Sequence, residues 1–96
     1  MANQKSLAYA HELLGDLVEN DRNKKTDFIQ TLKIFLRHNC NLKKAAEELF
    51  IHYNTLRYRI AKIEEITGLN LDCAEQRFCL QVALRLLKME AAGNKK

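Results

Sequence analysis

The chain has 96 residues, of which 47% are hydrophobic and 29% are charged, and its formal net charge is +4. This length allows one small domain over residues 1–96, and the hydrophobic fraction excludes a disordered chain. With no proline and only three glycines, the composition favours long helices and predicts an all-α fold of about five helices.

Two helices are predicted in the first 38 residues. The first covers about 6–20, where apolar residues recur every three or four positions: Leu7, Ala10, Leu13, Leu14 and Leu17. The polar stretch 20–25 then predicts a linker. A second helix is expected from Thr26 or Asp27 to His38, with Thr26 as a candidate N-cap and an apolar stripe of Phe28, Leu32, Phe35 and Leu36.

A helix-turn-helix is predicted over about 41–68. Asn41 is a good N-cap for a short helix over 42–50. A longer helix follows from Tyr53 or Asn54 to Thr67, and Gly68 is placed to end it in the left-handed conformation.

The fifth predicted helix is long and strongly apolar. Asp72 is the expected N-cap, and Glu75 three residues later completes the form of a capping box. Apolar side chains between Phe78 and Met89 cover most of its circumference as far as about Ala91, so this helix should be central or meet a second chain. The tail 93–96 is expected to fray.

The helix over 53–67 has two chemically different faces. Leu56, Ile60 and Ile63 follow at helical spacing and predict a buried stripe. About 100° per residue places a polar set on the opposite face, namely Asn54, Arg57 and Tyr58, with Lys62 beside them. Amide, guanidinium and phenol groups can contact base edges and phosphates in a major groove, which predicts a DNA-recognition helix.

Positive charge gathers in the same stretch. Between 41 and 62 the local net charge is +3, because two glutamates, Glu47 and Glu48, stand against five cations: Lys43, Lys44, Arg57, Arg59 and Lys62. Arg57 and Arg59 can bind guanine or phosphate in bidentate fashion. Glu64 and Glu65 follow at the carboxyl end, which suits a helix that enters DNA by its amino end.

Each of these features also has a structural explanation. Surface lysines and arginines are usually only solvated, and Tyr53 and Tyr58 can be packing residues. Arg59 lies nearer the buried stripe and could serve the fold. These alternatives stay open at the level of sequence.

The string I-H-Y-N-T-L-R-Y-R-I-A-K-I-E-E-I-T-G-L-N-L over 51–71 resembles the C-terminal helix-turn-helix domain of PucR-type bacterial transcription regulators, which include the sugar-diacid and purine-catabolism regulators. The likeness extends over about 13–87. The spacing is also similar to that of the Fis family of DNA-bending proteins. By the Fis likeness, DNA contacts fall on His52, Tyr53, Thr55 and Arg57, and the PucR likeness adds Asn54, Tyr58 and Arg59 as motif positions.

The resemblance implies a cytoplasmic, sequence-specific regulator of double-stranded DNA that needs no metal or other cofactor. Position 53 is often basic or small in this family, whereas this chain has Tyr53. Members usually carry an N-terminal sensory region, and we expect none within these 96 residues. Because helix-turn-helix proteins often bind as pairs, a homodimer is also expected.

Other functions fit the sequence less well. The odd count of three cysteines argues against a disulfide-stapled secreted domain, and the most apolar stretch is too short to span a membrane. His38 and Cys40 lack a second ligand pair at zinc spacing, and His52 has no catalytic partner motif, so no enzyme is expected. The alternative from another class is a helical protein–protein interaction module that never binds DNA, which the apolar fifth helix would serve.

Overall fold

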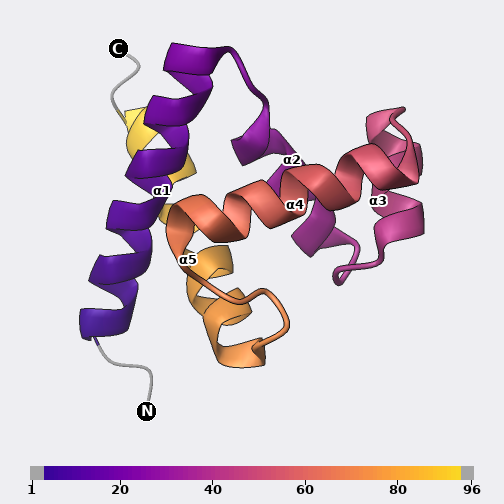
Figure 1. Ribbon diagram of the computed structural model, residues 1–96. Helices are drawn as coiled ribbons and strands as arrows, with labels where there is room; N and C mark the ends of the chain where they lie inside the picture. The colour runs from indigo at the N-terminus through magenta and orange to yellow at the C-terminus, as the bar shows by residue number, and fades with distance from the viewer. Residues whose placement is uncertain (1–3, 94–96) are drawn as a thin grey trace.

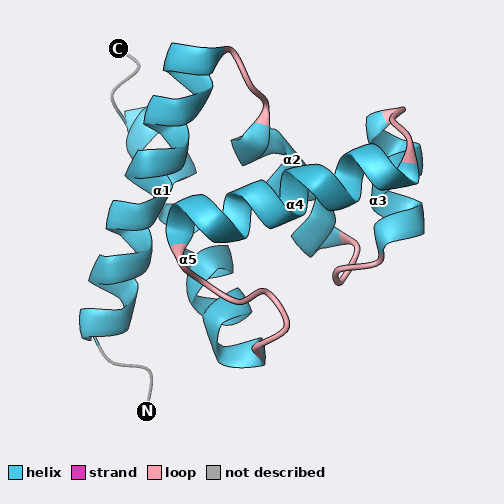
Figure 2. Cartoon of the chain, in the orientation of Figure 1, coloured by secondary structure: helices cyan, strands magenta, loops and turns pink. Residues whose placement is uncertain are grey.

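The computed structural model describes residues 4–93, and this part of the chain consists of helices joined by short loops, with no strand (Figures 1 and 2). The five helices are α1 (Gln4–Lys24), α2 (Phe28–Arg37), α3 (Leu42–Leu49), α4 (Tyr53–Thr67) and α5 (Ala74–Gly93). The predicted all-α class is therefore confirmed. None of the described helices is long and apolar enough to cross a bilayer.

Helix α4 occupies the centre of the arrangement. It runs from α3 to α1 and contacts α1, α2 and α3 (Figure 1). The predicted stripe faces this core: Leu56 and Ile63 are fully buried and Ile60 is nearly so. Thr67 at the end of the stripe is buried too, and its hydroxyl donates to the Ile63 carbonyl oxygen at 2.8 Å.

Helix α5 packs against α1 and α2 and makes no comparable contact with α4. It buries a row of residues on one side: Cys79, Leu80, Ala83 and Leu84. Phe78 and Leu86 are 56% and 41% exposed. Among its described side chains α5 is therefore buried on one side only, and the choice between a central helix and one that meets a second chain stays a prediction. The side chains beyond Leu87 lie outside the described part, as do those of Leu7, Ala10 and Leu13 and the predicted frayed residues 94–96.

Two of the predicted caps are confirmed. The Asn41 side-chain oxygen accepts from the Lys44 amide at 3.0 Å and so closes the amino end of α3. Gly68 ends α4 with φ 71°, and its amide donates to the Glu64 carbonyl oxygen at 2.7 Å.

The carboxyl end of α3 has a phenylalanine where glycine is usual. Phe50 is left-handed (φ 58°, ψ 42°), and its amide donates to the Glu47 carbonyl at 3.2 Å. The Ile51 amide donates to the Ala46 carbonyl at 3.1 Å, which completes a Schellman motif. The Phe50 side chain is 93% exposed, so it gains no packing energy within the described chain in return for the backbone strain.

Asp21 caps α2 from a distance. Its carboxylate accepts from the Phe28 and Ile29 amides at 2.9 and 3.0 Å, and the Thr26 hydroxyl donates to it. Thr26 is therefore not the cap, contrary to the prediction, and Asp27 makes no side-chain cap bond. Helix α1 continues past Asp21 to Lys24, so the linker is 25–27 and shorter than predicted.

The cap predicted for α5 is also wrong. The helix begins at Ala74, so Asp72 stands one residue too early, and the Cys73 carbonyl accepts the first helical bond from the Arg77 amide at 2.9 Å. The Asp72 amide donates instead to the Asn70 side chain at 2.9 Å. Asp72 thus belongs to the preceding loop.

Phe50 and Gly68, the left-handed residues that end α3 and α4, predict opposite mutational effects. Phe50→Gly should raise the free energy of unfolding by about 1 kcal/mol, because glycine adopts this conformation without steric cost. Gly68→Ala should lower it by about the same amount, since an added Cβ meets nothing within 4 Å and only the backbone is penalised. Urea denaturation measures both, and destabilisation by Phe50→Gly would contradict this account.

Removal of the distant cap should weaken the fold. Asp21→Ala leaves the Phe28 and Ile29 amides without their acceptor, and we expect a loss of about 1–2 kcal/mol in the free energy of unfolding. Asp16→Ala is the matched control, because Asp16 is exposed on the same helix. Equal stability of the two variants in thermal denaturation would show that Asp21 is not a cap.

Candidate nucleic-acid interface

The outer face of α4 is accessible along its amino-terminal half. Asn54, Arg57 and Tyr58 are all exposed, Tyr58 by 62%. Arg57 lies on the flank of α4 that also borders Leu42 at the start of α3. Tyr58 lies on the other flank, toward α1 and α2. The face opposite the buried stripe is thus free to lie against a partner.

The amino end of α4 is open to an anion. His52 is its N-cap residue but makes no side-chain cap bond, and the first turn contains no acidic residue. First-turn amides and the positive end of the helix dipole favour a negative group at this position. His52, Tyr53 and Thr55 surround this end and are exposed, Tyr53 by 46%.

Lys43 and Lys44 extend the exposed positive surface onto α3. Both lie in its first turn and both are exposed. Lys43 borders the same shallow hollow as Phe50, His52 and Tyr53. The turn between the two helices therefore brings a lysine of α3 beside the amino end of α4.

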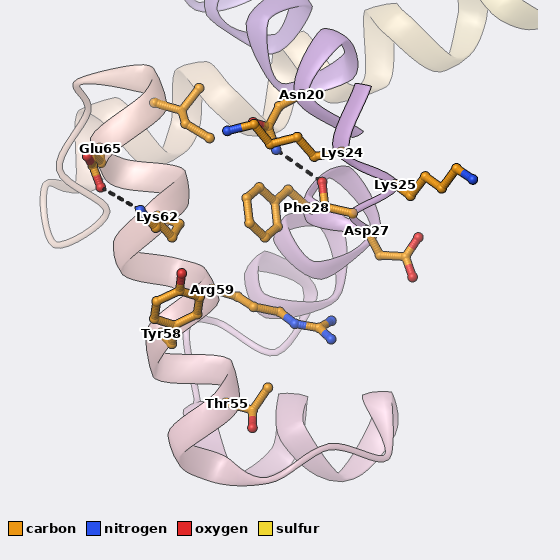
Figure 3. A pocket seen from close by; sticks show the side chains of 12 residues that line it. Asn20, Lys24, Lys25, Asp27, Phe28, Thr55, Tyr58, Arg59, Lys62 and Glu65 are labelled. Carbon is orange, nitrogen blue, oxygen red and sulfur yellow. Dashed lines mark hydrogen bonds and ion pairs between the residues drawn. The ribbon is translucent and has the colours of Figure 1, made fainter. Parts of the chain in front are cut away.

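Two of the predicted residues are partly engaged inside the protein. Arg59 is half-buried, and its guanidinium points toward α2, where Nη1 lies 3.5 Å from the Thr31 hydroxyl (Figure 3). Lys62 is also half-buried, with Nζ 3.5 Å from a Glu65 carboxylate oxygen and 5.8 Å from the centre of the Tyr58 ring. Arg59 thus has a packing role as well as a charge.

Several acidic residues near this face are engaged by other groups, whereas Glu47 is exposed beside Lys43 and His52. Glu64 accepts from the Leu71 amide at 3.0 Å, and Glu65 pairs with Lys62. Glu48 forms an ion pair with Arg37 and a hydrogen bond with His38, whose Nε2 lies 2.6 Å from Oε1. These contacts reduce the repulsion that free carboxylates would exert on a polyanion.

The metal and catalytic alternatives receive no support from the geometry. His38 is engaged with Glu48, and burial raises the pKa of the Cys40 thiol, which disfavours the thiolate that a metal or an electrophile requires. Among the side chains that the structure describes, no three or more His, Cys, Asp or Glu residues gather where they could hold a metal ion.

A pocket that the sequence did not predict lies beside α4. It has a volume of about 710 Å³ and is bordered by α4 and by the junction of α1 and α2 (Figure 3). Lys24 and Lys25 line it together with Arg59 and Lys62. Two adjacent lysines before a helix were visible in the sequence, but nothing local placed them next to α4.

Comparison with known proteins agrees with this geometry. Residues 28–86 match the PucR C-terminal helix-turn-helix domain family. The chain is similar to the proline-responsive transcriptional activator PutR of Bacillus subtilis strain 168, with 43% identity over 82 residues, which is 85% of this chain and 20% of the relative. It is also similar to the carbohydrate diacid regulator of Escherichia coli strain K12, with 46% identity over 57 residues, which is 59% of this chain and 15% of the relative. Its identity to the purine catabolism regulatory protein of B. subtilis is 30% over 81 residues, which is 84% of this chain and 15% of the relative.

The chain spans only about a fifth of the length of the curated relatives that it matches. No solved structure matches the chain.

Proposed function

The chain belongs to the PucR C-terminal helix-turn-helix domain family of transcription regulators, and from this premise we propose that it binds a specific sequence of double-stranded DNA with α4 in the major groove. The observation that carries the proposal is the exposed face of Asn54, Arg57 and Tyr58 on a helix whose other face is buried. An α-helix fits the major groove, where these polar groups can contact base edges and the flanking phosphates.

The exposed residues divide into two expected roles. His52, Tyr53, Asn54 and Arg57 lie at the amino end and on the outermost face, so we assign them to base contacts. We assign the phosphate contacts to the remaining residues, which lie on α3 and on the flank of α4: Lys43, Lys44, Thr55, Tyr58 and Lys62. Arg59 orients α4 against α2 through Thr31 and adds positive charge at the flank.

The regulator as a whole is expected to resemble its longer relatives. We propose that this domain acts with an N-terminal sensory region in the bacterial cytoplasm, and that two copies bind half-sites spaced by about 34 Å.

A second candidate function is self-association through α5. Phe78 and Leu86 are exposed apolar side chains on a helix that does not contact α4, so pairing there would leave the DNA-binding face free. Sedimentation equilibrium tests it: Phe78→Ser should weaken a wild-type dimer, and a monomeric wild-type domain at high concentration would rule the dimer out.

We predict that Arg57→Ala weakens binding to the preferred site by about 1–3 kcal/mol and relaxes base preference at one position. The preferred site comes from selection of bound sequences out of a random DNA pool, and mobility shift measures affinity. Arg85→Ala is the matched control, because Arg85 is exposed on α5, which has no contact with α4.

Two results would contradict this proposal. Failure of the selection to enrich any sequence would remove DNA recognition itself. Unaltered affinity and base preference in Arg57→Ala would remove Arg57 from the recognising residues while leaving the domain a DNA-binding protein.

A further inference from the structure

The pocket beside α4 is lined by cations from three segments of the chain. Lys24 ends α1, Lys25 lies in the linker, and Arg59 and Lys62 belong to α4. The nearly buried ring of Phe28 lies at its back, and Lys24 extends across it toward α4 (Figure 3). Asp27 and Glu65 also line the pocket, so four cations stand against two carboxylates, and the Lys25 side chain extends away from α4 (Figure 3). The corner is therefore net positive and is built from parts that are distant in sequence.

The four cations differ in how far they are already paired. Lys62 interacts with Glu65 and with the Tyr58 ring, and Arg59 is turned toward Thr31. For Lys24 and Lys25, by contrast, no ion pair is found with any of the side chains that the structure describes, and both lysines are exposed. These two lysines are thus the charges most available to an external anion.

The position of the pocket relative to α4 points to the kind of anion. Thr55, Tyr58 and Lys62 border the pocket and also flank the exposed face of α4. A helix about 10 Å across nearly fills a major groove about 12 Å wide, so a sugar-phosphate strand passes along each flank of the helix. The strand on the Tyr58 flank would run over the mouth of this pocket.

We propose that the corner between α1 and α2 is a second phosphate-binding element, in which Lys24 and Lys25 bind the DNA backbone on the Tyr58 flank of α4. The inference rests on the proposed function and extends it to residues outside the helix-turn-helix. The corner holds the duplex in register against α4 and carries no base preference of its own, because phosphates are the same at every position.

The test is the salt dependence of binding by the Lys24→Gln/Lys25→Gln double variant. Each phosphate contact contributes about 0.9 to the slope of log affinity against log salt, so the slope should fall by about 2 in the double variant. Affinity for the selected site and for a scrambled duplex should fall by the same factor, and circular dichroism should show unchanged helix content.

Lys33→Gln is the matched control. Lys33 is an exposed lysine of α2 that borders a different groove, between α2 and α5. It should retain the wild-type slope.

Neutral methylphosphonates, placed one at a time along the selected site, locate the contact. At one or two positions on one strand the wild type should lose affinity while the double variant does not. The inference would be overturned if no such position were found or if the salt slope of the double variant were unchanged. In either case, sequence-selective binding by the wild-type domain would still support the proposed function. A change of base preference in the double variant would also overturn it, and a wild-type domain without any preferred site would remove both proposals.

Discussion

The arrangement depends on the burial of one stripe along α4. Leu56 and Ile63 are fully enclosed by α1, α2 and α3, and burial of each such side chain stabilises the fold by about 1.5–3 kcal/mol. A rotation of α4 by a single position, about 100°, would pull this stripe out of the core. The packing therefore fixes which residues face outward, and Asn54, Arg57 and Tyr58 are exposed as a direct consequence.

Features that depend on residues close together in the chain could be predicted from the sequence. The Asn41 cap, the left-handed Gly68 and the apolar spacing of α4 all act within one or two helical turns, and the structure confirms each of them. The starts of α2 and α5 depend on hydrogen bonds between residues that are farther apart in the sequence. Asp21 binds amides seven and eight residues away, and Asp72 is drawn into a loop that Glu64 anchors through the Leu71 amide.

The candidate interface shows the same division. Helical periodicity was enough to predict the outward face of α4, and it left the role of Arg59 open until the contact near Thr31 was visible. The lysines at the α1–α2 corner could not be assigned to this surface from sequence. Their nearness to Tyr58 and Lys62, which follow 33 to 38 positions later in the chain, comes from the contact of α1 with α4.

The role of Asp21 bears on where this module begins. The family match starts at Phe28, the very residue whose amide Asp21 binds, and it leaves out all of α1. Yet α1 supplies that cap and the buried Leu14 and Leu17. The segment that the family model covers is thus shorter than the segment that folds together, and a chimaera joined at Phe28 would lose the Asp21 cap of α2.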